Sequence, residues 1–347
     1  MGPSIFFDQR PERPDIRSNS RHAHRQAAYF RGAMAPPAFL FYLHDMKPIS
    51  AKPYRAYPRT TLAEIPTYED FGAGEKALEK GLEHVRKRLG KFQDTMYAHG
   101  KYAVLMCLQG MDTAGKDSLI REVFKDFNAR GVVVHSFKVP TEIERKHDFL
   151  WRHYIALPAR GKFGVFNRTH YENVLVTRVH PEYILGEYLP DVHAVEDIDE
   201  AFWERRFEQI RAFEKTLAEN GTIVLKFFLH LSKEEQRQRL LRRLELRQKH
   251  WKFSPGDLEE RKLWDRYQEC YQEAIQKTTC NHAPWYVVPS DNKTAARLIV
   301  ASILEEVLTA HTDIREPELS EEVQANLEEY RGSLEAEKPS TSQKATP

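Results

Sequence analysis

A glycine loop between an apolar run and a polar helix is the part of this chain best suited to chemistry. The run Ala103–Leu108 leads directly into Gly110-Met-Asp-Thr-Ala-Gly115-Lys116. Glycines allow positive φ and a close approach to an anion, so the loop amides can surround a phosphate. The dipole of the following helix and the ammonium group of Lys116 add positive charge at the same place. The order of strand, glycine loop and helix therefore predicts a phosphate-binding loop.

Two acidic residues make this loop unusual. Asp117 follows Lys116, where such loops normally carry the serine or threonine that binds Mg²⁺. Ser118 comes one residue later, which on a helix turns its side chain by about 100°. Asp112 lies within the loop, where a carboxylate repels phosphate unless a metal ion or a proton lies between them. We therefore expect Asp112 to bind Mg²⁺ or to receive a proton from an incoming phosphate. The alternative is a glycine-rich turn without a ligand.

A second polar group follows the apolar segment Phe163–Phe166 and includes Asn167, Arg168 and Glu172. Because it follows a strand, we expect it beside the glycine loop at the same edge of the sheet. An acidic residue at this strand end commonly organises Mg²⁺, and Asn167 stands in its place, as a weak ligand or a group that orients the metal's waters. Arg168 can make a bidentate contact with phosphate. The alternative is a buried network of Asn, Arg and Tyr side chains.

A third group is the basic segment from Gln236 to Trp264. Arg239 and Arg243 lie four residues apart on one helix face, where like charges repel by a few tenths of a kcal/mol. An anion on that face would remove this cost. The segment His250–Asp257 is predicted to be a mobile turn between two helices. The basic helix, this turn and the second helix could together close over phosphates as a lid that excludes water. The alternative is a solvated surface helix.

The elements that must position these groups alternate between strand and helix along the chain. This alternation predicts an α/β fold with a mainly parallel sheet covered by helices on both faces. We expect strands at 103–108, 132–137, 163–166, 223–229 and 285–288. We expect helices at 75–98, 117–127, 141–151, 199–219, 255–278, 292–309 and 321–331, and a basic helix opened by a Ser232–Glu235 capping box. Trp285 is expected in the core.

Composition excludes several classes of function. The chain has 347 residues, 41% of them hydrophobic, and a formal net charge of +1, so it has no bulk attraction to nucleic acid or membrane. No apolar run approaches the roughly 18–20 residues that span a bilayer. The cysteines Cys107, Cys270 and Cys280 are far apart and lack metal-binding spacing, which suits a reducing environment. We therefore expect a cytoplasmic protein.

The domain organisation follows from shifts in composition. Residues 1–60 are rich in Arg, Pro and Ser and are expected to form a poorly ordered extension; the alternatives are a transit peptide or a true start at Met34 or Met46. Residues 61–310 form the expected phosphate-transferring domain, with the lid at about 233–262. Residues 311–347 are expected to be a partly disordered tail. The apolar stripe from Leu78 to Met96 predicts packing on the sheet or on a dimer partner.

Four segments together resemble the polyphosphate kinase 2 family. They read LQGMDTAGKDSLI, SFKVPTEIERKHDFLWRHYIALPARGKFGVFNRTHYENVLVTRV, WKFSPGDLEERKLWDRY and HAPWYVVPSDNK, and the resemblance spans about Leu62 to Leu308. The FNRTHYE wording is most similar to the subgroup that accepts both nucleoside mono- and diphosphates. The resemblance implies a P-loop kinase fold with a helical lid, a dimer or tetramer, and reversible Mg²⁺-dependent transfer of the terminal phosphate of inorganic polyphosphate to AMP or ADP, with Mn²⁺ as a substitute metal.

The resemblance also implies roles for individual residues. Asp112 would hold Mg²⁺ and help to activate the acceptor phosphate, and Asn167 and Glu172 would lie near the metal or nucleotide. Arg168 would clamp the transferring group beside Lys116. Phosphate or nucleotide would contact the rest of the loop: Gly110, Thr113, Ala114, Gly115, Asp117 and Ser118. Polyphosphate would follow a basic channel and the lid: Arg121, Lys125, Lys138, Arg239, Arg243 and Lys252. The lid lacks the Asp-Pro that relatives usually have before WK.

Three rival readings stay open at this point. An ATP-dependent nucleotide or nucleoside kinase would use ATP as the donor on the same fold. A nucleotide-binding regulatory protein with a weak site is slightly favoured by Asn167 and by the missing Ser/Thr. A phosphohistidine intermediate would use one of His135, His147, His153 and His170, of which His170 lies nearest to Arg168 in the sequence.

Overall fold

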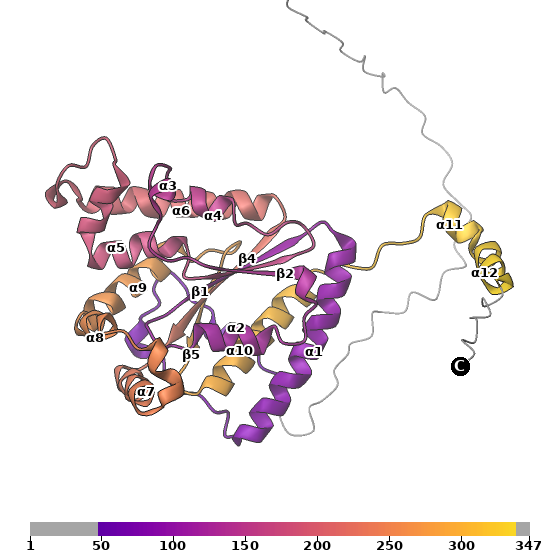
Figure 1. Ribbon diagram of the computed structural model, residues 1–347, viewed down its shortest axis with the longest axis horizontal. Coiled ribbons are helices and arrows are strands. Elements are labelled where there is room, and N and C mark those ends of the chain that lie inside the picture. Colours follow the sequence, from indigo (N-terminus) through magenta and orange to yellow (C-terminus); the bar gives the residue numbers. More distant parts are fainter. Residues whose placement is uncertain (1–47, 338–347) are drawn as a thin grey trace, which may run out of the picture. The chain divides into compact units, whose positions relative to one another are not determined.

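Five parallel strands form the centre of the computed structural model, which describes residues 48–337 (Figure 1). Their order across the sheet is β2-β3-β1-β4-β5. The strands are β1 (Ala103–Gln109), β2 (Val132–Ser136), β3 (Phe163–Asn167), β4 (Thr222–His230) and β5 (Trp285–Pro289). Every residue of β1 is buried, as expected for a central strand covered on both faces. The predicted parallel α/β sheet is thus confirmed.

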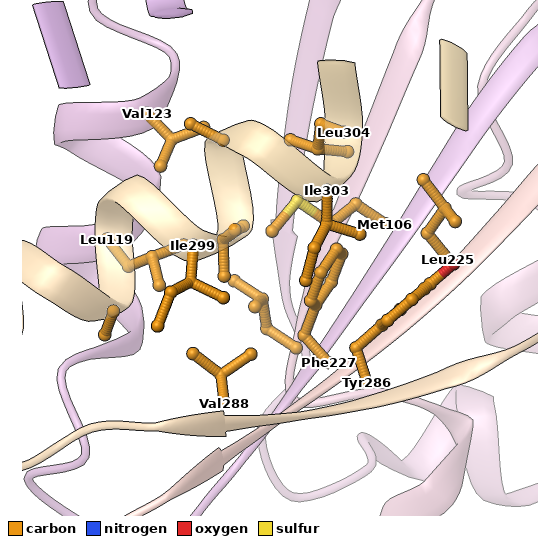
Figure 2. Close-up of a cluster of buried hydrophobic side chains, with 14 of the residues drawn as sticks. Met106, Leu119, Val123, Leu225, Phe227, Tyr286, Val288, Ile299, Ile303 and Leu304 are labelled. Atoms are coloured by element: carbon orange, nitrogen blue, oxygen red, sulfur yellow. The ribbon is translucent and has the colours of Figure 1, made fainter. Parts of the chain in front are cut away.

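One face of the sheet is covered by α1 (Glu75–His99), α2 (Lys116–Val123) and α10 (Lys293–Thr309). Figure 2 shows Ile299 and Ile303 of α10 packed over Phe227 and Val288 of the sheet. The apolar stripe of α1 is buried in the same cluster. Of the two alternatives for that stripe, the structure shows packing within the chain, against α10 and the sheet.

The opposite face is covered by α5 (Val176–Val179), α6 (Glu200–Glu219) and α9 (Trp264–Thr278), which lie together above the sheet in Figure 1. Asp199 caps α6 by accepting a hydrogen bond from the amide of Phe202 (2.7 Å), so the predicted start of this helix is confirmed. Trp285 is buried among these helices, as predicted.

The basic segment folds into three short pieces, α7 (Lys233–Glu245), η7 (Arg247–Lys252) and α8 (Gly256–Lys262). Ser232 caps α7, but the predicted capping box is only half formed, because the Glu235 carboxylate binds Arg239 instead. The helix predicted over 255–278 breaks at Leu263, whose ψ of 14° lies outside the helical range.

Two further helices are shorter than predicted. The segment 141–151 forms α3 (Glu142–Arg145) and stops before α4 (Trp151–Tyr154), because the Asp148 carboxylate accepts the amide hydrogen of Leu150 in place of a helical carbonyl. The helix predicted over 117–127 ends at Val123. Beyond it the chain turns toward α1, where Asp126 binds Arg86 (2.6 Å).

The structure differs from the predicted boundary at residue 61, because residues 48–60 pack on the domain. Ala51 and Ala56 are buried, and the amide of Ala56 donates to the carbonyl of Trp285 (2.8 Å). The proposed start sites Met34 and Met46 and the transit-peptide alternative lie outside the described residues. The remaining short elements are η1 (Lys52–Tyr54), η2 (Leu62–Glu64), η3 (Ala129–Gly131), η4 (His170–Val174), η5 (Pro181–Glu187) and η6 (Val195–Asp197).

The C-terminal part of the described chain forms two exposed helices, α11 (Glu321–Ala325) and α12 (Leu327–Ala336), where one was predicted. They are separated at Asn326, whose side-chain amide donates to the carbonyl of Glu322 (3.0 Å) and so ends α11. Over residues 48–337, no helix combines the length and the apolar character needed to cross a membrane.

Candidate active site

The glycine loop lies at the carboxyl end of β1 and leads into α2, as the sequence predicts. Gly110 and Gly115 have φ of 153° and 106°, and Thr113 has φ of 67°. A Cβ on Gly110 would lie 3.0 Å from the carbonyl oxygen of Leu229 and 3.1 Å from the Ala114 side chain. Glycine is therefore required at Gly110 both for its backbone angle and for lack of space.

Lys116 is held on the loop that it follows. Its Nζ donates to the carbonyl of Gly110 (2.5 Å), and the carbonyl of Met111 lies at 3.4 Å. Burial lowers the pKa of Lys116, and the nearby Asp112 carboxylate opposes this shift. The ammonium group thus lies where a phosphate on the loop amides would meet it.

Asp117, which follows the lysine, and Asn167, at the end of β3, both depart from the usual pattern, and they bind each other. The Nδ2 of Asn167, at the end of β3, donates to the Asp117 carboxylate (2.7 Å) and approaches the Ser136 hydroxyl (3.3 Å). A site of this kind normally has a hydroxyl after the lysine and a carboxylate at the strand end. Here the carboxylate follows the lysine and the amide stands at the strand end, so the pair still contributes one negative charge. Ser118, in contrast, donates to the carbonyl of Gly115 (2.9 Å).

The other polar atom of the Asn167 side chain, Oδ1, is buried. Within residues 48–337 it has no hydrogen-bond partner. A buried carbonyl oxygen without a partner is costly, so it marks a position for a ligand or a water molecule. Asn167 itself is 7% exposed.

Arg168 and Asp112 approach each other across the mouth of the loop. Arg168 has φ of 59°, and its Nη2 lies 3.3 Å from the Asp112 Oδ1. Glu172, on η4, lies close enough to both Arg168 and Lys116 to interact electrostatically. Burial raises the pKa of Glu172, while these two cations act in the opposite direction. Two carboxylates and two cations thus surround the loop.

The oxygen donors of this site fit a small, hard cation. Asp112 offers a carboxylate and Asn167 an unpaired amide oxygen, with Asp117 and Glu172 beside them. Within the described part of the chain, no group of three or more His, Cys, Asp or Glu residues could enclose a metal ion. A site with few protein ligands suits Mg²⁺, which keeps several waters and binds substrate phosphates.

A cavity of about 390 Å³ opens over the loop and is dominated by basic side chains. It brings together most of the residues predicted for the site: Asp112, Thr113, Ala114, Gly115, Lys116, Asp117, Ser118, Arg121, Asn167, Arg168, Arg239, Arg243 and Lys252. Four predicted residues are not in its wall: Gly110, Lys125, Lys138 and Glu172. Lys125 and Lys138 are exposed elsewhere on the surface.

Three cations of the cavity were not predicted: Arg242, Lys249 and Lys293. The first two belong to the same basic segment as the predicted lid residues. Lys293 follows β5, so its position after a predicted strand was a usable signal for the same sheet edge. Burial, together with the nearby Arg239, lowers the pKa of Lys293 to about 8.

Arg239 contacts the loop itself. Its Nη1 donates to the carbonyls of Thr113 (3.0 Å) and Ala114 (3.1 Å), and its Nη2 donates to those of Ser290 (2.6 Å) and Asp291 (2.9 Å). It therefore braces the glycine loop against the segment between β5 and α10.

The predicted repulsion between Arg239 and Arg243 is relieved within the protein. Arg239 binds Glu235 (2.7 Å) and Arg243 binds Asp257 (2.8 Å). The expectation that this helix face needs an external anion is thus wrong, because each guanidinium has a carboxylate of its own.

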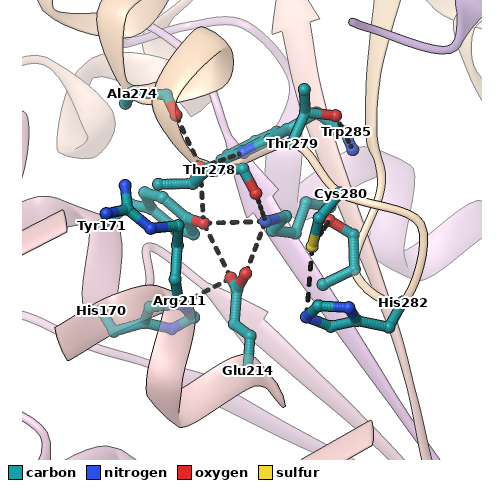
Figure 3. A network of polar contacts seen from close by, with 12 residues as sticks. His170, Tyr171, Arg211, Glu214, Ala274, Thr278, Thr279, Cys280, His282 and Trp285 are labelled. Atoms are coloured by element: carbon teal, nitrogen blue, oxygen red, sulfur yellow. Dashed lines mark hydrogen bonds and ion pairs between the residues drawn. The ribbon is translucent and has the colours of Figure 1, made fainter. Parts of the chain in front are cut away.

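The FNRTHYE stretch divides between the cavity and the core. Asn167 and Arg168 line the cavity, whereas His170 and Tyr171 point into the buried polar network drawn in Figure 3. His170 is fully buried, and its Nε2 binds Glu214 (3.1 Å). A phosphohistidine at His170 is therefore ruled out by burial, and His135, His147 and His153 are absent from the wall of the cavity.

Comparison with known proteins gives matches over most of the chain. The model of a family described as Polyphosphate kinase 2 matches residues 73–316. An ADP-polyphosphate phosphotransferase of Rhodopseudomonas palustris is 47% identical over 72% of this chain and 86% of its own length. An AMP/ADP-polyphosphate phosphotransferase of Meiothermus ruber is 46% identical over 69% and 84%.

Among solved structures, a polyphosphate kinase 2 from Arthrobacter aurescens TC1 is similar, with a TM-score of 0.73 and 37% identity over 82% of this chain and 96% of that one. The family match includes the glycine loop, the Asn167 stretch and the basic segment. The chain belongs to the polyphosphate kinase 2 family.

Proposed function

We propose that this protein transfers the terminal phosphate of inorganic polyphosphate to AMP or ADP, and that the transfer is reversible. The observation that carries the proposal is a glycine loop at the floor of a cavity lined by many cations, from Arg121 on α2 to Lys293 on α10. One nucleotide phosphate chain would not need so many. A long polyanion, in contrast, can contact several of them at once, apart from Arg239, whose donors are taken up within the protein. The names of the two relatives above support both acceptors.

The side chains around the loop serve direct transfer between two phosphates. The loop amides, Lys116 and Arg168 lie where negative charge on the transferring group would be neutralised. Lys116 is fixed in advance by the loop carbonyls, so it needs little reorganisation during the reaction, and Arg168 approaches Asp112 from the other side of the loop. The segment α7–η7–α8 carries Arg242, Arg243 and Lys252 over the cavity, where it would exclude water and so favour transfer over hydrolysis.

Asp112 and Asn167 are the residues that would hold Mg²⁺, with Glu172 behind them, and Mn²⁺ would occupy the same place. When bound, the ion would offset the charge of the phosphates that meet above Asp112. Asp112 would also be close enough to an acceptor phosphate to receive its proton. We further propose that the enzyme acts in the cytoplasm as a homo-oligomer, a dimer or tetramer.

The test is turnover with Mg²⁺ and polyphosphate, followed by separation of AMP, ADP and ATP. AMP alone and ADP alone are each incubated with and without polyphosphate. Stepwise conversion of AMP to ADP and ATP is expected only when polyphosphate is present. Conversion of ADP but not of AMP would keep the reaction class and refute the dual acceptor.

Two further outcomes would refute the proposal itself. Transfer from ATP to AMP without any use of polyphosphate would show an ATP-dependent nucleotide kinase. Tight nucleotide binding without turnover of either acceptor would show a regulatory binding protein. A Lys116→Ala variant serves as the control for contaminating kinases, because it should reduce any activity that belongs to this site.

A further inference from the structure

A fully buried ion pair lies beneath the active site, between Lys226 of β4 and Glu214 of α6 (2.6 Å). The Lys226 Nζ also donates to the Tyr171 hydroxyl (2.9 Å) and to the carbonyl of Thr278 (2.9 Å). The Glu214 carboxylate accepts from Tyr171 (2.7 Å) and His170 (3.1 Å). All five residues have no exposed surface. Figure 3 shows Glu214, Tyr171 and Thr278 converging on one point.

This network joins η4 and α9 to the consecutive elements α6 and β4. Tyr171 belongs to η4, which begins two residues after Arg168 and carries Glu172. Thr278 is the last residue of α9, the helix that follows the basic segment over the cavity. Lys226 belongs to β4 and Glu214 to α6. The network therefore connects η4 and α9 to the central sheet and to the helix that covers it. Tyr171 also packs edge-on against Trp285 of β5, with ring centroids 4.7 Å apart.

A contribution to the stability of the fold does not by itself explain why a charged pair is buried here. Burial by itself would raise the pKa of Glu214, but Lys226 and His170 hold it below its usual value, so the carboxylate is ionised. Burial lowers the pKa of His170, so its ring is neutral and donates from Nε2. Removing two charges from water is expensive, and apolar or neutral replacements of buried ion pairs are often as stable as the pair. What a saturated pair does supply is a single arrangement of its partners.

The neighbouring active site needs such an arrangement. Arg168 has positive φ and, among residues 48–337, a single ion-pair contact, at 3.3 Å to Asp112. On one side its backbone is held by Asn167 at the end of β3, and on the other by Thr169, which accepts from Gln109 (3.1 Å), and by His170 and Tyr171, which belong to the network. We propose that the Lys226–Glu214 pair is a positioning pair for phosphoryl transfer, which holds η4 and so sets Arg168 against the glycine loop. The proposal rests on the proposed function and names residues that do not touch the substrates.

The test compares the double variant Lys226→Met/Glu214→Gln with both single variants. The singles leave a buried charge or an unpaired partner and should melt at lower temperature than the wild type. The double leaves no buried charge, so its melting temperature should recover. If the pair only stabilises the fold, kcat recovers with it. If the pair positions η4, kcat of the double stays about tenfold or more below wild type, because small misplacements of reacting groups are costly.

The KM for polyphosphate provides a second readout. The cations of the cavity lie mainly on α2, α7, η7 and α10, and none of them belongs to η4. This KM should therefore stay within about twofold of wild type in the double variant, while kcat falls. A double variant with wild-type stability and wild-type kcat would overturn the proposal.

A matched control is available on the same helix. Arg206 of α6 is buried and forms an ion pair with the partly buried Glu187 of η5, and neither residue lines the cavity. The double variant Arg206→Met/Glu187→Gln should keep kcat within about twofold of wild type at temperatures where it is folded. An equal loss of kcat in this control would mean that any damage to α6 slows the enzyme, and would refute a specific role for Lys226 and Glu214.

If the Lys226 double variant does not fold, Tyr171→Phe decides the matter. It keeps the ring against Trp285 and removes the hydroxyl through which η4 contacts both Lys226 and Glu214, while His170 of η4 keeps its own contact with Glu214. A fall in kcat with little change in melting temperature supports the proposal, and unchanged kcat refutes it. Because wild-type turnover is measured first, failure of this inference is distinguishable from failure of the proposed function.

Discussion

Replacement of Arg239 by lysine separates two roles that the sequence cannot distinguish. As a lid cation, Arg239 would need only its charge, and lysine would preserve it. As a brace for the glycine loop, Arg239 needs the planar array of donors that reaches Glu235, Thr113 and Ala114 on one side and Ser290 on the other. The structure favours the brace, so we expect Arg239→Lys to be damaging.

The size of the effect follows from the donors. Arg239 makes five contacts, counting Asp291, whereas an ammonium group has three hydrogens. At least two contacts are lost, and a hydrogen bond that involves a charged group contributes about 1.5–3 kcal/mol. The free energy of unfolding should therefore fall by about 3 kcal/mol. Because the loop loses its support, kcat should fall by about tenfold or more.

The measurement combines denaturant unfolding with initial rates at saturating polyphosphate. The control is Arg237→Lys on the same helix, where an exposed arginine binds Glu234 with two hydrogen bonds. Surface pairs of this kind contribute little, so the control should change stability by less than about 1 kcal/mol and leave kcat unchanged. If Arg239→Lys matches Arg237→Lys in stability and rate, the brace is refuted.

Three further predictions concern the loop, the basic cavity and the fold. Asp112→Asn and Lys116→Ala should each lower kcat at least about tenfold, a loss of roughly 1.4 kcal/mol of transition-state stabilisation, and near wild-type initial rates in either would contradict the site. With a pKa of about 8, Lys293 is cationic below that pH and neutral above it. The KM for polyphosphate should therefore rise between pH 7 and 9, and Lys293→Met should flatten this rise; identical profiles would refute the role. Gly90→Ala should destabilise by about 1–3 kcal/mol, because its Cβ would lie 2.5 Å from a backbone oxygen beyond α2. Gly332→Ala, inside the exposed helix α12, meets nothing within 4 Å and should not lower the melting temperature.

The sheet was predictable because each of its strands is a short apolar run bounded by polar residues. Burial on both faces makes these runs continuous in β1, β3, β4 and β5, whereas the edge strand β2 leaves Val133 and Val134 exposed. The parallel order follows from the helices between the strands. The ends of helices were harder to predict. The break near Asp148 and the end of α2 depend on one side chain that replaces a backbone acceptor and on one ion pair to α1. Local propensity does not contain either contact.

The site was predictable to the extent that it lies within the glycine loop and the residues just after β3. The pairing of Asp117 with Asn167 joins residues from two strand ends, and sequence alone showed only two separate departures from the usual pattern. Arg239 was identified as basic, but its role as a brace depends on backbone carbonyls that no side-chain pattern reveals. Lys293 reaches the cavity only because β5 is the neighbour of β4.

The N-terminal segment 48–60 has a consequence for how the chain behaves when it is shortened. β5 lies at one border of the sheet, and the segment covers it through the bridge between Arg55 and Tyr286 and the hydrogen bond from Ala56 to Trp285. A chain that begins at residue 61 would keep the whole glycine loop and cavity but expose the backbone groups of an apolar strand, WYVVP. Unpaired strand edges of this kind recruit other chains. Such a shortened protein would aggregate through β5, and its loss of activity would be a failure of solubility rather than of catalysis.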